Sequence, residues 1–206
     1  MPHDHHDHAP IEIEEGRPEE AQVLSEALRE LLIEKGIFSA DDMNKEVAAM
    51  SKRKPGNGAA MVARAWLDSD YKDRLLRHGP SAAREMGFDI GAAQLLVVEN
   101  TPKVHNVIVC TLCSCYPVML LGPSPEWYKS KNYRKRTVNE PREVLKEFGT
   151  EIPSTKEVRV HDSTADMRYM VLPERPEGTE DWNAEQLAAL VNVDSLIGVT
   201  TADSPK

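Results

Sequence analysis

All three cysteines of this 206-residue chain fall within six consecutive positions, at Cys110, Cys113 and Cys115. An odd and small number of cysteines cannot build a disulfide framework. A chance cluster of buried cysteines is a poor explanation for three of them in so short a segment. The fold must therefore present this segment as one loop on which the sulfurs converge, which predicts a redox or metal site.

The residues alone leave several kinds of chemistry open. A thioredoxin-like pair of Cys110 and Cys113 leaves Cys115 unexplained. A zinc site takes three thiolates and a fourth ligand, for which His105 is the candidate. A low-spin Co(III) or Fe(III) centre takes the three sulfurs and the backbone nitrogens of Ser114 and Cys115, with Cys110 axial and a sixth position open. On chemistry alone, the zinc site ranks above the low-spin centre.

Charge and hydropathy narrow the class of protein. The chain has 34 acidic and 25 basic residues, a net charge of -9, which argues against a general nucleic-acid binder. No apolar run reaches the roughly 18 residues of a membrane span. The N-terminal MPHDHHDHAP lacks the basic start and apolar stretch of a secretory signal. We therefore expect a soluble, cytoplasmic protein with no nucleic-acid and no membrane partner.

Composition divides the chain into three expected parts. Residues 1–16 are rich in His and Asp and predict a disordered tail with loose metal affinity. Residues 17–88 predict a helical N-terminal region, and residues 89–206 an α+β domain that carries the cysteines. The first two helices have wide apolar stripes, so they pack either on the body of the chain or on a partner subunit.

Local patterns place the individual elements. Ser39 and Asp42 form a capping-box pattern ahead of a helix, whereas SKRKPGNG at 51–58 predicts a loop. Val158 and Val160 alternate with polar residues, as in a half-buried strand. The other expected strands are 95–99, 104–109, 167–172 and 196–200, and the other expected helices are 59–67, 69–78, 81–86, 140–148 and 183–192.

The cysteine segment VCTLCSCYP resembles the metal-binding claw of nitrile hydratase α subunits. The resemblance extends to ENTPKVHNVIVCTLCSCYP, EWYKSKNYRKR, EPREVLKEFG, EVRVHDSTADMRYMVLPERPEGT and DSLIGV, and covers roughly residues 20–200. It includes the γ subunit of thiocyanate hydrolase, which shares the claw. We therefore expect an α+β fold in which a helical N-terminal arm precedes a layered α-β-β-α domain that carries the claw.

The resemblance implies roles for individual residues. Cys110, Cys113 and Cys115 match the thiolate ligands, and the backbone nitrogens of Ser114 and Cys115 match the amide ligands. Cys113 matches the position oxidised to sulfinic acid and Cys115 the position oxidised to sulfenic acid. Thr111 matches the cobalt branch, which makes cobalt(III), one per chain, the expected metal and iron(III) the alternative. The catalytic residues are then Cys113, Ser114 and Cys115.

The sequence departs from the family at two places near the substrate. Val118 follows Tyr116-Pro117 where the family usually has Trp, and 91–93 reads Gly-Ala-Ala where it usually has Gln-Gly-Glu. We expect Val118 and Tyr116 to line the substrate pocket. Arg168 matches an arginine near the claw, with a surface ion pair as the alternative. SPEWYKS and RPEGT are similar to the branch that contains thiocyanate hydrolase and a hydratase of a nucleoside nitrile.

Outside the claw, other residues have simpler interpretations. Trp127 and Tyr128 are expected in the core or an interface, and the basic run KNYRKR at 131–136 is expected to face solvent or a subunit. His105 and His161 are expected to be structural.

Three functions follow from this reasoning. The first is the catalytic α subunit of a nitrile hydratase, a lyase that converts a nitrile and water to an amide. A β-type partner would supply arginines to the oxidised cysteines, and the substrate would be a small-molecule nitrile, with the departures at Val118 and 91–93 favouring a bulky heteroaromatic one. The alternative is the γ subunit of thiocyanate hydrolase. A weaker alternative is a zinc-binding interaction module.

Overall fold

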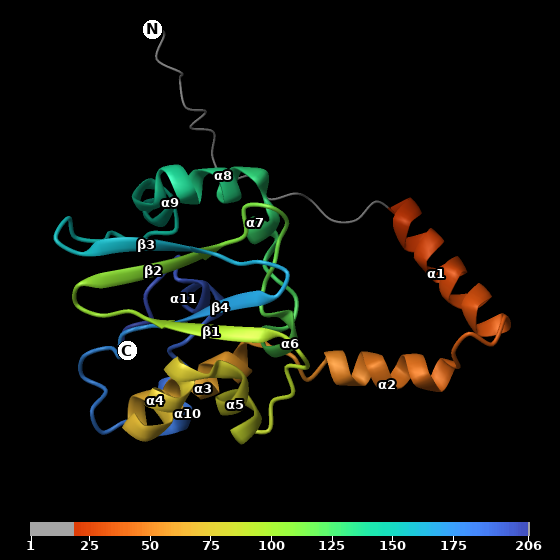
Figure 1. Ribbon diagram of the computed structural model, residues 1–206, viewed down its shortest axis with the longest axis horizontal. Coiled ribbons are helices and arrows are strands. Elements are labelled where there is room, and N and C mark those ends of the chain that lie inside the picture. Colours follow the sequence, from red (N-terminus) through yellow and green to blue (C-terminus); the bar gives the residue numbers. More distant parts are fainter. Residues whose placement is uncertain (1–18, 206) are drawn as a thin grey trace, which may run out of the picture.

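The computed structural model describes residues 19–205 and has four layers of helices and strands (Figure 1). Helices α8 (Lys131–Asn139) and α9 (Pro141–Glu147) cover the strands β3 (Glu157–Asp162) and β2 (Val104–Val109). Strands β4 (Met167–Leu172) and β1 (Gln94–Glu99) form the next layer. Below them lie α3 (Pro55–Leu67), α4 (Ser69–Arg77), α5 (Gly79–Glu85) and α10 (Ala184–Ala188). The expected α+β fold and its α-β-β-α layers are confirmed. The expected tail at 1–16 lies outside the described residues.

The strands form two parallel pairs. Strand β1 (Gln94–Glu99) pairs with β4 (Met167–Leu172), and β2 (Val104–Val109) pairs with β3 (Glu157–Asp162). Strand β2 is buried along most of its length, as expected of a parallel strand between layers. Its last residue, Val109, stands opposite Asp162, so the loop that follows β2 begins beside the end of β3.

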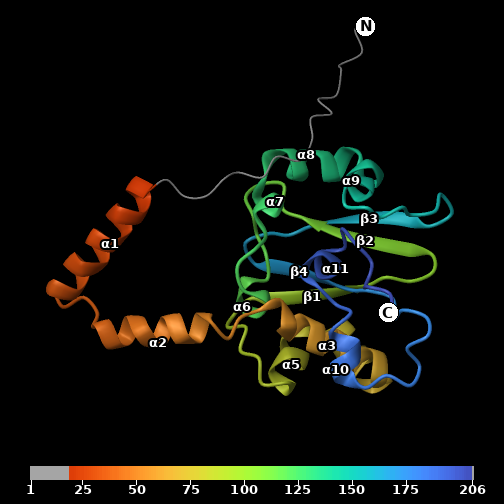
Figure 2. The same cartoon turned by 180° about the vertical axis from the view of Figure 1, so that it is seen from behind.

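Helices α1 (Glu19–Glu34) and α2 (Ala40–Met50) form an arm that extends away from the body (Figures 1 and 2). Neither helix has a buried residue, so the arm does not pack on the rest of the chain. The predicted capping box is present at the start of α2, where the side chains of Ser39 and Asp42 bond each other's backbone amides. The arm exposes large apolar side chains, namely Val23, Leu24, Leu28, Leu31, Ile37, Met43, Val47 and Met50.

Two expected elements are wrong. The predicted loop at 51–58 ends early, because Pro55 occupies the first turn of α3 and helix continues through Gly58. The predicted strand at 196–200 is instead the end of α11 (Val193–Ile197), which Asn192 and Ser195 cap and which Gly198 ends in the left-handed conformation. Its apolar residues are buried against β4 and β2. The prediction was wrong because a short buried helix and a buried strand have the same run of apolar residues.

The short helices α6 (Val118–Leu121) and α7 (Glu126–Lys129) follow the cysteine loop. Helix α8 is held against β2 by Tyr133, which is fully buried and whose hydroxyl donates to the carbonyl of Ile108 at 2.6 Å. The rings of Trp127 and Phe148 pack edge-on against Tyr133 at 4.9 and 6.3 Å. This aromatic cluster holds α7 and α8 together beside β2.

Within residues 19–205, none of the helices combines the length and the apolar character that crossing a bilayer requires.

Candidate metal centre

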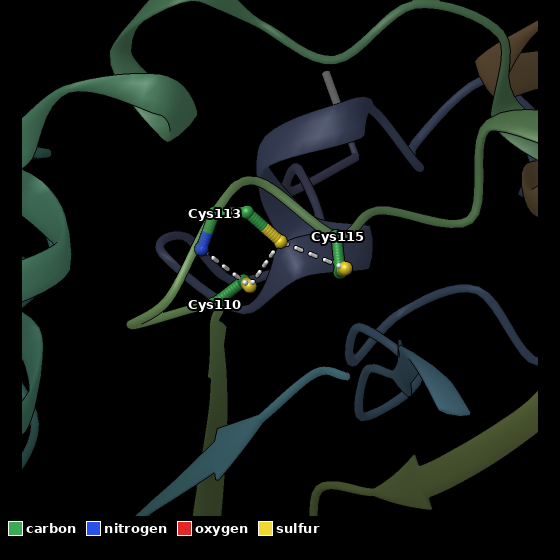
Figure 3. A group of neighbouring side chains, drawn as sticks. All are labelled: Cys110, Cys113 and Cys115. Carbon is green, nitrogen blue, oxygen red and sulfur yellow. Dashed lines mark hydrogen bonds between the residues drawn. The ribbon is translucent and has the colours of Figure 1, made fainter. Parts of the chain in front are cut away.

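The three thiols converge on one side of the loop between β2 and α6 (Figure 3). The sulfur of Cys113 lies 3.4 Å from that of Cys110 and 3.1 Å from that of Cys115. Cys110 and Cys115 are buried, whereas Cys113 is exposed. Among residues 19–205 these cysteines form the one group of three or more His, Cys, Asp or Glu side chains able to hold a single metal ion, with ligand atoms within 4.8 Å of one another.

The surroundings separate the pKa values of two of these thiols. Hydrogen bonds from the Cys115 and Cys110 thiols lower the pKa of Cys113 below its usual range. Burial raises the pKa of Cys115, and the nearby Arg168 guanidinium acts in the opposite direction. The exposed Cys113 is thus the more readily ionised and the more accessible of the two thiols.

The loop backbone also hydrogen-bonds the sulfurs. The amide of Cys113 donates to the Cys110 sulfur at 3.3 Å, and backbone hydrogen bonding by Ser114 and Cys115 contributes to the lowered pKa of Cys113. The predicted ligand nitrogens of Ser114 and Cys115 belong to the same short loop as the three sulfurs. Three soft sulfurs around one point suit a transition metal better than a hard cation.

Residues distant in sequence hold this loop in place. Thr111 donates from its amide and its hydroxyl to the Asp162 carboxylate, at 2.9 and 2.6 Å. The Tyr128 hydroxyl donates to the carbonyl of Cys115 at 2.8 Å, and Arg134 Nη1 donates to the carbonyl of Cys113 at 2.7 Å. These contacts tie the loop to β3, α7 and α8, respectively.

Sequence reasoning missed Asp162 and Arg134 as parts of this site. The expectation that the basic run 131–136 faces solvent or a subunit fits the exposed Lys131 and Lys135 and is wrong for the buried Tyr133 and Arg136. Arg134 is partly buried and bonds the claw backbone. No sequence pattern marks Arg134, because it reaches the loop that follows β2 only through the packing of its neighbour Tyr133 on β2.

The predicted pocket residues line one small cavity of about 60 Å³. Tyr116 is buried, its hydroxyl has no hydrogen-bond partner among the described residues, and its ring lies edge-on to Tyr128. Val118 is 42% exposed, so it does not face the core. Arg168 enters from β4, Ala93 from the segment that departs from the family pattern, and Gln94 from the start of β1. The remaining lining residues are Ile90, Leu95, Pro117, Met119 and Leu120.

His105 does not join the cysteines. Its Nε2 lies 2.7 Å from the carbonyl oxygen of Gly198, and its Nδ1 lies 3.3 Å from the side-chain nitrogen of Asn100. His161 bonds the side chain of Asn106 at 2.8 Å. Both histidines thus bond groups within the fold, and the zinc hypothesis has no fourth ligand among the described His, Cys, Asp and Glu side chains of this cluster.

Known proteins cover nearly the whole chain at high identity. It is 47% identical over 189 residues to the low-molecular weight cobalt-containing nitrile hydratase subunit alpha of Rhodococcus rhodochrous, covering 91% of each chain. It is 44% identical over 190 residues to the thiocyanate hydrolase subunit gamma of Thiobacillus thioparus, covering 86% of this chain and 78% of that one.

Solved structures agree with these relatives. A double mutant of the Fe-type nitrile hydratase from Comamonas testosteroni Ni1 matches with a TM-score of 0.84 and 44% identity, covering 92% of this chain and 94% of that chain. A recombinant thiocyanate hydrolase with partially modified cobalt centres matches with a TM-score of 0.83 and 41% identity, covering 92% and 96%. Residues 19–200 match the family described as nitrile hydratase, alpha chain. With 44–47% identity to relatives over most of its length, this chain belongs to the nitrile hydratase α-chain family.

Proposed function

We propose that this chain is the metal-binding catalytic subunit of a nitrile hydratase, which adds water to a nitrile to give the amide. The chain is an enzyme subunit of the nitrile hydratase type and acts with a partner subunit. The observation that carries the proposal is the convergence of three sulfurs on one loop, with the Cys113 sulfur 3.4 Å from that of Cys110 and 3.1 Å from that of Cys115.

The proposed ligands are the sulfurs of Cys110, Cys113 and Cys115 and the backbone nitrogens of Ser114 and Cys115. The proposed metal is cobalt(III), in line with Thr111 and the cobalt-containing relative, and iron(III) is the alternative because an Fe-type neighbour has the same fold. When bound, the metal would supply Lewis acidity toward the nitrile nitrogen. The residues around it would orient the substrate.

Cys113 and Cys115, the two cysteines that we propose are oxidised, differ in exposure to solvent, which suits them to different roles. Cys113 is exposed, so a sulfinate there would face outward, where arginines of the partner subunit can reach it. Cys115 is buried and directly precedes Tyr116, which lines the cavity, so a sulfenate there would lie close to a substrate in the cavity. Either this sulfenate oxygen or a water molecule would attack the nitrile carbon. Arg168, whose charge acts on Cys115, would balance negative charge at that sulfur.

The cavity bears on substrate size. The walls at Val118 and Ala93 replace bulkier residues of the family pattern with small ones. A small nitrile would be held loosely there and would lose more in orientation than a bulky one. We therefore propose a bulky heteroaromatic nitrile as the substrate class; since the cavity of this chain holds only about 60 Å³, such a substrate would extend past the exposed Val118 toward the partner subunit.

Thiocyanate hydrolase γ subunit is the second candidate function. It is supported by the 44% identity to such a subunit, close to the value for the cobalt nitrile hydratase, and by Arg168 on the cavity wall. A small anion would favour a tight, positively charged pocket, so the small apolar residues at Val118 and Ala93 weigh against this function.

The test is to co-express the chain with its partner subunit, measure the metal by mass spectrometry, and assay a heteroaromatic nitrile, acetonitrile and thiocyanate. We expect one cobalt per chain, amide formation, and about three added oxygen atoms on Cys113 and Cys115 together by intact mass. Cys113→Ala is the matched inactive control, because it removes a ligand from an exposed position. Zinc with unmodified thiols would refute the proposal, and thiocyanate as the best substrate would replace it with the second candidate.

A further inference from the structure

The carbonyl oxygens of two claw cysteines each accept a hydrogen bond from a side chain on α7 or α8. Arg134 Nη1 donates to the Cys113 oxygen at 2.7 Å, and the Tyr128 hydroxyl donates to the Cys115 oxygen at 2.8 Å. Both donors lie within seven residues of each other on α7 and α8. The claw backbone is thus held at two carbonyl oxygens by side chains of α7 and α8.

The hydrogen bond from Arg134 determines the orientation of the Cys113–Ser114 peptide plane. None of the described peptide bonds is cis, so the carbonyl oxygen and the amide hydrogen of this peptide point in opposite directions. The oxygen points to Arg134, so the Ser114 N–H points away from Arg134, and hydrogen bonding by the Ser114 backbone contributes to the lowered pKa of Cys113. Holding the oxygen toward Arg134 therefore also holds the Ser114 N–H in one direction.

Arg134 is itself held on a rigid element. The preceding residue, Tyr133, is fully buried and bonds the carbonyl of Ile108 on β2, and Ser130 caps the start of α8. The guanidinium bonds the Cys113 carbonyl through Nη1, while its buried Nε has no hydrogen-bond partner among the described residues. A rigid second layer of this kind is what fixes ligands in productive geometry.

We propose that Arg134 is a positioning residue for metal binding, which acts from within this chain by holding the Cys113 carbonyl and thereby the orientation of the Ser114 nitrogen. The inference rests on the proposed metal centre. Resonance links the oxygen and nitrogen of one peptide, so a cation at the Cys113 oxygen also balances negative charge on the Ser114 nitrogen. The role differs from that of the partner's arginines, which are proposed to meet sulfur-bound oxygens.

The experiment compares four variants in the complex with the partner subunit. Arg134→Met keeps an unbranched side chain and removes the hydrogen-bond donors, whereas Arg134→Lys keeps the charge and one donor group. Tyr128→Phe removes the hydrogen bond to the Cys115 carbonyl and keeps the packing of the ring. Lys135→Met is the matched control, since it removes the same charge from the next, exposed position of α8. The readouts are cobalt per chain, the rate of cobalt loss to a chelator, the metal–thiolate absorption band, and the thermal midpoint of the metal-free complex.

We expect Arg134→Met to lose cobalt at least tenfold faster than wild type and to shift the absorption band, while the thermal midpoint of the metal-free complex stays within a few degrees. Arg134→Lys should recover most of the retention, Tyr128→Phe should show a smaller loss, and Lys135→Met should match wild type. Wild-type retention and an unchanged band in Arg134→Met would overturn this inference and leave the proposed function standing. A wild-type complex that binds no cobalt or iron would overturn both.

Discussion

The carboxylate of Asp162 accepts two hydrogen bonds from Thr111, one from its amide at 2.9 Å and one from its hydroxyl at 2.6 Å. Asp162 ends β3, and its register partner Val109 ends β2, directly before the first claw cysteine. A side chain from β3 thus fixes the point at which the backbone leaves the sheet and enters the claw.

Removing this hydroxyl should loosen the claw without unfolding the chain. Thr111→Val keeps the shape of the side chain and loses one bond to a charged acceptor, which at this exposed site is worth about 1 kcal/mol, or roughly a fivefold change. We expect cobalt loss to a chelator to be about fivefold faster in Thr111→Val. Thr111→Ser, which keeps the donor, should match wild type, and equal rates for the valine and serine variants would contradict the prediction.

Filling the cavity at Val118 should change substrate preference. Val118→Trp puts a large ring into a space of about 60 Å³, so bulky nitriles should be excluded before small ones. We expect the ratio of kcat/KM for a heteroaromatic nitrile over acetonitrile to fall by about tenfold or more. The control is Leu67→Trp, a similarly exposed position that does not line this cavity. An unchanged ratio in Val118→Trp would remove Val118 from the pocket.

The buried His105 should make stability depend on pH. Burial is the main cause that lowers its pKa below 6.5; Lys156 and Arg142 act in the same direction, and the Gly198 carbonyl and Glu174 oppose it. Because the unfolded chain then binds a proton more readily than the folded one, stability is greatest above about pH 6.5 and decreases as the pH falls toward the folded pKa.

We expect the free energy of unfolding, measured in urea, to be lower at pH 5 than at pH 7.5. Burial also lowers the pKa of His161, so part of this dependence should remain in His105→Gln, with a shallower slope than in wild type. An identical slope in the two proteins would show that His105 does not carry the effect.

Gly198 should tolerate no side chain. It ends α11 with φ +87°, and a Cβ there would lie 2.0 Å from the backbone oxygen of Asn106 on β2. We expect Gly198→Ala to destabilise the chain by about 3 kcal/mol or more, from overpacking against an atom that cannot move aside. Gly87 provides the control, with φ +80° and nothing within 4 Å of its Cβ position, where Ala should cost about 1 kcal/mol. Thermal unfolding of both variants measures the difference.

Local rules predicted the elements whose determinants lie close together in sequence. The Ser39–Asp42 capping box and the Val158/Val160 alternation each involve a few neighbouring residues, and the structure has a helix and a strand there. The three claw sulfurs converge because Cys110, Cys113 and Cys115 share one loop.

The elements and the site residue that the sequence did not predict depend on tertiary packing. Gly58 lies in α3, where its missing side chain leaves room for Leu121 and Leu196; a Cβ at this position would lie 2.6 and 2.8 Å from carbons of those two side chains. Residues around Leu196 form a helix because they fill the space beside β4 and β2, which no local pattern specifies. Arg134 reaches the claw 21 positions away through a helix that Tyr133 docks, so its role is invisible in the linear sequence.

The parallel pairing of the strands also has a consequence during synthesis. The cysteines leave the ribosome before β3 and β4, which carry Asp162 and Arg168, because parallel partners follow long connections. At roughly 5–20 residues per second, the thiols wait several seconds for the strands that shape their loop. During that interval the cysteine loop lacks its contacts with Asp162 and Arg168. We therefore expect the metal to be loaded onto the full-length chain rather than onto the nascent one.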